Sequence, residues 1–283
     1  MNAVSEKSIS IRDIETSGEM RDVEALQREV WGVPDLDVVP ASQLVAARHS
    51  GGTLIGAFNG ETMIGFVYGF AGFENGKPVH HSHMLAVKQE YRNFHLGYQL
   101  KLAQRNRVLK QGIDLMTWTF DPLQSLNAYI NFGKFGVVSD RYFVNFYGED
   151  APSFLHRNGT DRLWVSWLLS SKRVHERLNG AGPRIDRENL QPMIELGNNN
   201  VPLRGDLSEN ADQILSIAIP KNIGEIEKND PALAAEWREE TRWAFTKALA
   251  AGYLVEEFVR RSEGENEYGV YFLSPGKKIE DIP

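Results

Sequence analysis

The chain has 283 residues, of which 42% are hydrophobic and 24% charged, and it carries a formal net charge of −7 with no cysteine. This is the composition of an ordinary soluble globular protein with one large or two smaller domains. The missing cysteines exclude disulfides, cysteine-ligated zinc and a cysteine nucleophile, and the negative charge gives no indication of a nucleic-acid or anionic-membrane partner.

The N-terminal sequence MNAVSEKSIS is polar and lacks the apolar core of a signal peptide. No apolar run approaches the ~18 residues that a membrane span requires. We therefore expect a cytoplasmic protein.

The first part of the chain is predicted to form an antiparallel meander. In order, we expect a strand at residues 8–14, helices at 18–31 and 41–49, and strands at 53–58 and 62–73. The last two strands are joined through Asn59-Gly60, and Asn-Gly between apolar runs is the strongest short hairpin signal. A second turn at 74–78 leads into a further strand.

Residues 79–97 are predicted to form that strand, then a polar turn, then the start of a helix. Strand alternation predicts one shared face for His81, His83, Leu85 and Val87. Residues 96–111 are rich in Leu, Lys, Gln and Arg, which favour helix. A strand that enters a helix through a tight turn presents free backbone N–H groups, which together with the helix dipole can hold an anion.

The rest of the chain is expected to add a strand–helix–strand section and an appended lobe. Strands are predicted at 113–120, 137–147 and 163–169, and helices at 123–135 and 171–178. A turn-rich connector with a candidate short strand at 193–196 follows. The last predicted elements are a strand at 214–219, a helix from Asp230-Pro231 to Gly252, and strands at 253–260 and 268–273. We therefore predict a domain at 1–170, a connector at 171–205 and a C-terminal β-α-β-β lobe at 206–283.

The motif around the turn resembles that of the Gcn5-related N-acyltransferase (GNAT) superfamily, whose members bind acyl-coenzyme A. Leu85-Ala86-Val87 matches the end of the superfamily's strand. Arg92 and Gly97 match the first and last positions of its Arg/Gln-x-x-Gly-x-Gly/Ala turn. His95 stands where the inner glycine is expected, and its Cβ restricts both the backbone conformation and the approach of a phosphate.

This resemblance covers about residues 8–169 and implies an α/β (α+β) fold with a mixed, mostly antiparallel central sheet flanked by helices. It implies acetyl-CoA or another acyl-CoA as co-substrate, with the pyrophosphate on the turn and the pantetheine along a split between two strands. The implied cofactor-binding residues are Leu85, Ala86, Val87, Arg92, Asn93, Phe94, His95, Leu96, Gly97, Tyr98 and Asn127.

The segment 121–136 resembles the superfamily's second cofactor motif. Asn127 matches an asparagine that contacts the pantetheine arm, although its spacing to Gly136 is shorter than usual. Phe132 stands where a tyrosine commonly protonates the leaving thiolate, and phenylalanine has no proton to give. Tyr129, on the same predicted helix, is the other candidate for that role. Packing is the simpler interpretation of both rings.

His81 and His83 are the candidates for removing a proton from an acceptor amine, because imidazole titrates near neutral pH and only a neutral amine attacks a thioester. Two residues apart on a strand, they are expected about 7 Å from each other. The pattern His-x-His-x-Leu-Ala-Val is similar to a strand of arylalkylamine N-acetyltransferases, where the pair serves proton removal. The alternatives are histidines that only pack, or a metal bound by His80, His81 and His83, for which the sequence shows no further ligand.

Three C-terminal segments resemble a larger bacterial group of these acyltransferases, which is linked to N-acylamino acid metabolism, including N-succinylation of amino acids beside a racemase. They are DRLWVSW (161–167), AIP (218–220) and the run from WREETRWAF to AGY (237–253). Without that resemblance, Trp237, Trp243 and Phe245 are expected to form the core of the lobe, which could shape the acceptor pocket.

Together these features predict an acyl-CoA-dependent N-acyltransferase that moves an acetyl or succinyl group to the amine of a small molecule, such as an amino acid, by direct attack. The predicted catalytic residues are His83, His81 and Tyr129, and no metal, nucleic acid or membrane partner is expected. Two alternatives stay open. One is a catalytically inactive acyl-CoA sensor or scaffold, which His95 and Phe132 favour. The other is a partner role of the lobe, including a homodimer.

Overall fold

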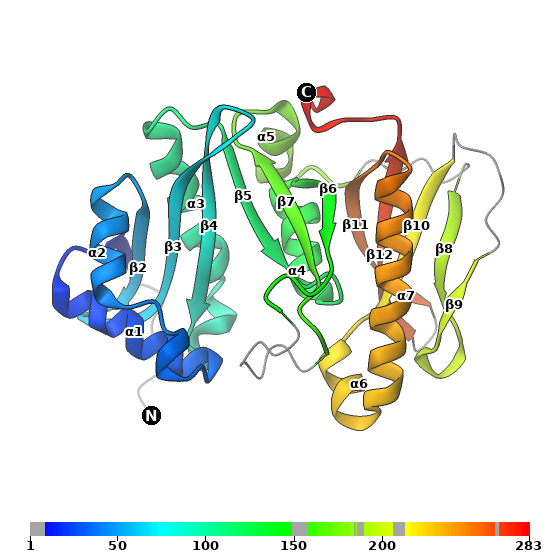
Figure 1. Cartoon of the computed structure of the whole chain (residues 1–283), viewed down its shortest axis with the longest axis horizontal. Helices are drawn as coiled ribbons and strands as arrows, with labels where there is room; N and C mark the ends of the chain where they lie inside the picture. The colour runs from blue at the N-terminus through cyan, green and yellow to red at the C-terminus, as the bar shows by residue number, and fades with distance from the viewer. Residues whose placement is uncertain (1–8, 149–157, 184, 186–189, 206–212, 264–265) are drawn as a thin grey trace. The chain divides into compact units, whose positions relative to one another are not determined.

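The computed structural model describes residues 9–148, 158–183, 185, 190–205, 213–263 and 266–283 (Figure 1). These residues form two compact units, of which the first runs to Trp118 and the second from Thr119 to Pro283. The division therefore falls within a strand and earlier than residue 170, where the first predicted domain ends. The three-part domain division stays a prediction.

The described part of the first unit is built on an antiparallel meander, as predicted. Its strands are β1 (Ile9–Asp13), β2 (Thr53–Asn59), β3 (Thr62–Glu74), β4 (Lys77–Val87) and the beginning of β5 (Leu115–Phe120). They lie in chain order, antiparallel from β1 to β4 and parallel from β4 to β5. In the β3–β4 turn, Asn75 and Gly76 have φ of 51° and 74°. Two such positive angles are the reason that Asn-Gly favours tight hairpins.

Helices cover both faces of this sheet. They are α1 (Ser17–Trp31), α2 (Ala41–His49) and α3 (Leu96–Lys110), with short 3₁₀ helices η2 (Asp35–Asp37) and η3 (Gln89–Phe94). Helices α1 and α2 pack on one face, where Val23, Leu44 and Phe66 belong to one buried cluster. Helix α3 packs on the other face, where Val67 and Leu100 belong to a second cluster. Strands buried on both faces read as nearly continuous apolar runs, as β2 and β3 do.

Helix α1 shows why the helix boundaries were predicted closely. The Glu19 backbone N–H donates to the Thr16 hydroxyl at 3.2 Å, and the Glu19 carboxylate accepts from the Thr16 backbone N–H at 3.0 Å. This capping box satisfies two N–H groups that the helix itself cannot. Gly32 ends the helix in the left-handed conformation, with φ of 62°.

The second unit holds the remaining described elements. Its strands are β6 (Val138–Phe143), β7 (Arg162–Leu168), β8 (Leu190–Leu196), β9 (Pro202–Arg204), β10 (Ile214–Pro220), β11 (Tyr253–Glu263) and β12 (Asn266–Pro275). Its helices are α4 (Ser125–Ala128), the π-helix η4 (Tyr129–Phe135), α5 (Lys172–Leu178), α6 (Ile223–Asn229), α7 (Pro231–Ala250) and the short η6 (Asn198–Asn200) and η7 (Ile279–Asp281). The strand order is β7-β6-β11-β12-β10-β8-β9, with β8 and β10 parallel and the other neighbours antiparallel. Both units thus have mostly antiparallel sheets flanked by helices, and the predicted fold class is confirmed.

Some predicted elements of the second unit differ from the structure. The helix expected at 123–135 consists of α4 followed by the wider η4, in which a Cβ on Gly133 would lie 3.1 Å from the Tyr129 ring. The strand expected at 137–147 ends at Phe143, and Asn145 follows with φ of 48°. The expected connector contains α5, β8 and β9, and β9 is too short to show a periodic pattern. Helix α6 was not predicted, and residues 206–212 of the predicted lobe lie outside the described residues.

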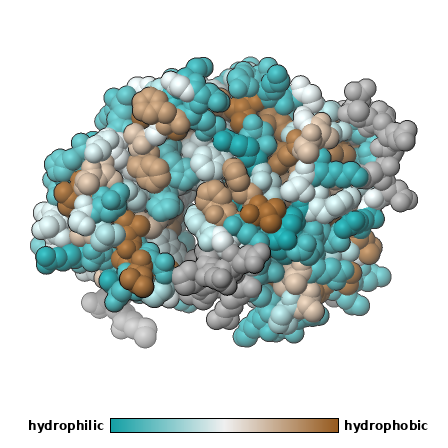
Figure 2. Space-filling model, in the orientation of Figure 1, coloured by the Kyte–Doolittle hydropathy of each residue, from teal (hydrophilic) through white to brown (hydrophobic). Residues whose placement is uncertain are grey.

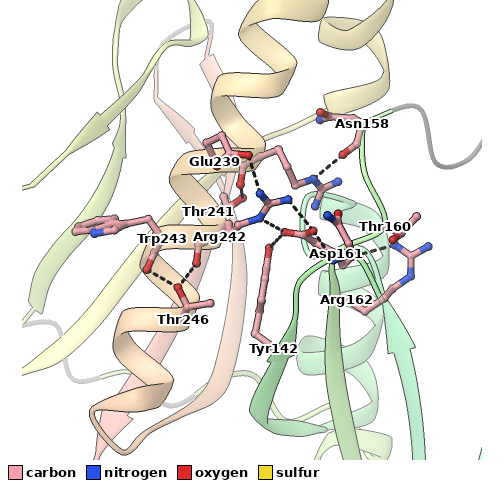
Figure 3. A network of polar contacts seen from close by, with 12 residues as sticks. Tyr142, Asn158, Thr160, Asp161, Arg162, Glu239, Thr241, Arg242, Trp243 and Thr246 are labelled. Atoms are coloured by element: carbon pink, nitrogen blue, oxygen red, sulfur yellow. Dashed lines mark hydrogen bonds and ion pairs between the residues drawn. The ribbon is translucent and has the colours of Figure 1, made fainter. Parts of the chain in front are cut away.

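A polar network holds α7 against the β6–β7 segment (Figure 3). Arg242 donates to both carboxylate oxygens of Asp161, at 2.8 and 3.0 Å, and the Tyr142 hydroxyl donates to the same carboxylate at 2.7 Å. Arg238 donates to both oxygens of Asp121 at 2.8 and 2.9 Å. Asp161 and Arg238 are buried, where bidentate pairing satisfies a charge that would otherwise be costly.

The aromatic side chains of α7 are the core of this unit, in part as expected. Trp237 and Phe245 are fully buried, and the Trp237 indole N–H donates to the Asn200 carbonyl at 2.7 Å. Trp243 is only half-buried, and the Arg204 guanidinium lies 4.2 Å from the centroid of its ring. Figure 2 shows small hydrophobic patches among hydrophilic residues on the face that it presents. Within the described residues, no helix combines the length and apolar character needed to cross a membrane.

Candidate functional site

Strand β4 carries a β-bulge at the predicted histidine pair. In its register with β3, Met84 pairs with Tyr68 and Ser82 pairs with Gly69, so His83 is an extra residue on β4. A bulge of this kind shifts the alternation of side chains by one residue and turns the strand locally. It therefore decides which of the predicted site residues share a face.

His81 and His83 lie together, as predicted, with ring centroids 6.3 Å apart. The Phe70 ring lies 5.4 Å from the His81 ring and 5.7 Å from the His83 ring. Leu85 and Val87 instead pack with the buried cluster on the α3 face. The prediction that all four side chains share one face is wrong, because strict alternation does not count the residue that the bulge inserts.

His83 lines a groove of about 420 Å³ beside α2. Tyr68 and Phe70 give the groove aromatic walls, and Gln43 and Ser50 add polar groups. Among the described residues that line it, none has a side chain charged at neutral pH. The groove therefore suits a molecule with an uncharged, partly apolar body placed beside an imidazole.

The histidines of β4 have lowered pKa values. Burial, followed by the fields of His83 and Lys101, lowers the pKa of His81 to about 4. The pKa of His83 is also lowered, because the protein around its ring removes part of the water that would stabilise the charged form, while the rest of the side chain is exposed on the groove. Both rings are therefore neutral at neutral pH, and a neutral imidazole has a nitrogen that can accept a proton. The His81 Nδ1 lies 3.0 Å from the Thr117 hydroxyl on β5, which fixes the orientation of its ring.

A buried polar cluster occupies the opposite face of β4. His80 Nε2 lies 3.0 Å from the Thr53 hydroxyl, which also accepts a hydrogen bond of 2.9 Å from Gln104 Nε2. The Ser82 hydroxyl donates to Gln104 Oε1 at 2.7 Å and accepts from Lys101 Nζ at 2.7 Å. The cluster thus joins β2, β4 and α3 through side chains that the alternation of β4 directs away from His81 and His83.

Lys101 is the member of this cluster that the sequence analysis missed. It is only 7% exposed, and burial lowers its pKa well below the usual value for lysine. Its Nζ lies 3.6 Å from the centroid of the Trp118 ring. A signal was present, because Lys101 stands between Leu100 and Gln104 on the helical stripe that α3 buries.

The predicted anion-binding turn consists of η3 and the beginning of α3. His95 has φ of 54° and ψ of 21° and is the residue that precedes the helix. This left-handed conformation explains why glycine is expected there, since a side chain at such a position costs about 1 kcal/mol. The first helical hydrogen bond runs from Gln99 N–H to the His95 carbonyl, at 3.1 Å. The N–H groups of Leu96 and Gly97 therefore have no acceptor within the helix.

The other predicted cofactor residues of the first unit surround this turn. Arg92 and Asn93 are exposed, and Arg92 Nε donates to the Val87 carbonyl at 3.4 Å. Phe94 is half-buried against the Tyr91 ring, with centroids 6.0 Å apart. Ala86 packs with the cluster under α1 and α2. The turn thus offers one guanidinium and a set of N–H groups to an anion.

Three predicted residues belong to the second unit. Asn127 is exposed on α4, and Tyr129 is half-buried with Lys134 Nζ 5.5 Å from its ring centroid. Phe132 is fully buried and packs edge-on against Tyr271, with ring centroids 5.7 Å apart. Packing therefore accounts for Phe132, while the roles of Asn127 and Tyr129 stay predictions.

The histidines of β4 do not converge on one point. His80 is fully buried on the α3 face, whereas His83 lines the groove beside α2. Across the described ranges, no group of three or more His, Asp or Glu side chains is placed to hold a metal ion.

No family model matches the chain, and no curated protein matches it in sequence. Solved structures are similar to it in fold. The ribosomal-protein-S18-alanine N-acetyltransferase of Escherichia coli matches 63% of this chain and 99% of its own, with a TM-score of 0.45 and 12% identity. A GNAT family acetyltransferase from Elizabethkingia anophelis, solved with acetyl-CoA bound, matches 58% and 99%, with a TM-score of 0.44 and 16% identity. An N-acyl amino acid synthase from uncultured soil microbes matches 57% and 91%, with a TM-score of 0.44 and 11% identity.

Proposed function

We propose that the protein is an acyl-CoA-dependent N-acyltransferase that transfers an acyl group to an amine by direct attack. The observation that carries this proposal is the arrangement of β4. The strand bulges at His83, pairs with β5 only as far as His81, and leads through the left-handed residue His95 into α3. A split beside the strand and an anion-binding turn after it are the features that the GNAT resemblance connects with acyl-CoA.

The acyl-CoA site follows from these features. The turn suits a pyrophosphate through the N–H groups of Leu96 and Gly97, the positive end of the helix dipole and the Arg92 guanidinium. In the described part of the chain, β4 and β5 pair over two residues of each strand, His80 with Met116 and His81 with Thr117. Beyond these pairs, the backbone groups of β4 that point away from β3 are available to the amides of a pantetheine arm, in the manner of an added strand.

The chemistry assigned to the histidines is proton removal. The acceptor amine occupies the groove beside α2, where His83 takes a proton from its nitrogen directly or through water, and His81 supports this transfer. The nitrogen attacks the thioester carbonyl carbon, the C–S bond breaks, and an amide and coenzyme A are formed. The lowered pKa values keep both imidazoles in the proton-accepting form throughout the neutral range.

The groove also bears on the acceptor. Because its described lining has no cationic side chain, it favours an amine with an apolar or aromatic body over one that carries a carboxylate. An amino-acid acceptor, as predicted from the C-terminal segments, needs a cation from outside this lining. The choice between acetyl and succinyl donors belongs to the same proposal, and both donors are included in its test.

The test combines calorimetric titration with acetyl-CoA and a thiol-release assay. Acetyl-CoA and succinyl-CoA are each offered with amines such as 2-phenylethylamine and with amino acids such as phenylalanine. We expect binding and thiol release, with the amine preferred to the amino acid. His83→Gln should lower kcat about 100-fold without changing the Kd for acetyl-CoA, the size typical of a lost general base. His175→Gln, the same change at an exposed histidine of α5, is the matched control. Binding without thiol release would contradict catalysis, and no binding would contradict the whole proposal.

A further inference from the structure

A buried lysine stands where β4 and β5 separate. The last residues that pair the two strands are His81 and Thr117, and the next residues along each strand are Ser82 and Trp118. Lys101 Nζ donates to the Ser82 hydroxyl at 2.7 Å and lies 3.6 Å from the centroid of the Trp118 ring. Its amine therefore touches the first residue of each strand beyond their pairing.

The surroundings of this amine weaken its hold on its proton, which makes it a better proton donor than an exposed lysine. Ser82 gives its own hydrogen to Gln104 Oε1, so its oxygen is directed at Lys101 as an acceptor. The titratable groups that face Lys101 are the imidazoles of His80 and His81, whose pKa values its charge lowers. Among the described residues, no carboxylate forms an ion pair with it. A buried ammonium supported only by a hydroxyl and an aromatic face loses its proton more readily than one in water.

The proposed reaction needs a proton at this end of the split. When the amide forms and the C–S bond breaks, coenzyme A leaves as a thiolate, which is a poorer leaving group than a thiol. The position that the GNAT resemblance gives to a protonating tyrosine holds Phe132, a buried ring with no proton to give. Tyr129 of the second unit stays a predicted candidate for this acid, and Lys101 is a proton donor that the first unit itself places beside the split.

We propose that Lys101 protonates the leaving thiolate, an inference that rests on the proposed function. The acceptor nitrogen bonds to the carbonyl carbon, the C–S bond breaks, and the sulfur takes a proton from Lys101 Nζ. Lys101 is left as a neutral amine that keeps its hydrogen bond to Ser82. The proton that the acceptor amine gave to the His81–His83 pair passes to solvent, and Lys101 regains one from solvent before the next turnover. The step yields an amide and the free thiol of coenzyme A.

The decisive experiment varies the leaving group. Lys101→Met keeps an unbranched side chain of similar length but has no proton to give, and Lys110→Met makes the same change at the exposed end of α3 as a control. Each variant is assayed with acetyl-CoA and with its selenoester analogue, whose selenolate leaves without protonation because its conjugate acid is stronger. With acetyl-CoA we expect Lys101→Met to lose about 100-fold in kcat at unchanged Kd, and with the selenoester only about threefold. Equal losses with both donors, or no loss with either, would overturn the assignment.

A pH profile gives a second readout that a purely structural role would not move. Lys101 acts as an acid, so kcat of the wild type should fall as the pH rises through its pKa, below the usual range of lysine. His80 and His81 lose their protons near pH 4 and cannot produce this alkaline fall. The guanidinium of Lys101→Arg holds its proton too tightly to give it to a thiolate, so the residual kcat of this variant should be low and should show no alkaline fall. If Lys101→Arg is active and retains the fall unchanged, the assignment is refuted. If the wild type neither binds nor cleaves acetyl-CoA, the proposed function itself has failed.

Discussion

Acid should destabilise this protein through His80, a fully buried side chain. The Thr53 hydroxyl accepts from Gln104, and its own hydrogen can go to His80 Nε2 when that nitrogen carries no proton. The Nδ1 hydrogen then has no partner among the described groups. A second proton would place an imidazolium among buried dipoles and beside Lys101. Burial, then Lys101, then His81 therefore lower the pKa of His80 from 6.5 to about 4.

The sign and size of the effect follow from proton linkage. Because the folded-state pKa lies below the unfolded value, the unfolded chain takes up the proton first. Stability is therefore complete above about pH 6.5 and is lost as the pH falls towards about 4. A difference of about 2.5 pH units corresponds to about 3 kcal/mol in total. Between about pH 7.5 and pH 4.5, the same linkage gives a loss of about 2.5 kcal/mol.

The measurement compares wild type with His80→Gln, which removes the titrating ring and keeps a polar group beside Thr53. Free energies of unfolding in urea at both pH values give a double difference in which carboxylate titrations cancel. We expect the variant to lose about 2.5 kcal/mol less than the wild type. In an NMR titration, the imidazole signal that disappears in the variant should have its midpoint near pH 4. If acid lowers the free energy of unfolding equally in both proteins, or if the midpoint lies near 6.5, the reasoning about this cluster is refuted.

Two further predictions concern the turn and the second unit. His95→Gly should raise the free energy of unfolding by about 0.5 kcal/mol and tighten acetyl-CoA binding, because it relieves a side chain held in the left-handed conformation. Asn106→Gly inside α3 should instead lower the free energy of unfolding, by about 0.3 kcal/mol. Weaker binding by His95→Gly in calorimetry would contradict the role given to the turn. Asp161→Ala should lower the free energy of unfolding by about 3 kcal/mol, because it leaves the Arg242 and Tyr142 donors without their acceptor, whereas Glu239→Ala removes an exposed ion pair and should cost less than about 0.5 kcal/mol. If both variants lose a similar free energy of unfolding in urea, the buried Asp161–Arg242 pair stabilises the protein no more than an exposed pair does.

Local sequence signals were sufficient to predict most helices and strands of the first unit. Helix α2 was predicted at 41–49 and lies at Ala41–His49. The predicted turns of the meander also form, with Gly60 between β2 and β3 and Asn75-Gly76 between β3 and β4. The bulge at His83 was not predicted, because it depends on register with another strand rather than on the residues around it. Gly69, opposite the bulge, was an available hint. A Cβ there would lie 2.5 Å from His80 Nε2 and 2.6 Å from the His81 carbonyl oxygen, and an isolated strand glycine often marks such a close approach.

The polar cluster on the α3 face of β4 could not be predicted from local sequence patterns for a similar reason. Thr53, Ser82 and Gln104 are separated by many residues in the chain, and each alone reads as an ordinary polar position. Lys101 reads as a solvent-facing helical lysine until the stripe of α3 is placed on the sheet. Burial is a property of the assembled sheet and helix, so the chemistry of this lysine could be inferred only from the fold.

In the structure, the C-terminal segments that resemble a larger bacterial group contain residues that pack the second unit. Asp161 and Arg242 stand in two of these segments, and they are partners in the network that holds α7 against β6 and β7. Trp237 is a core side chain of the same helix. A buried charged residue that loses its partner destabilises the fold, so these residues serve the packing of the second unit. The groove beside α2 draws its described lining from none of these segments. A resemblance in these segments therefore concerns the second unit, and the proposal about the acceptor amine depends on the groove that His83 lines.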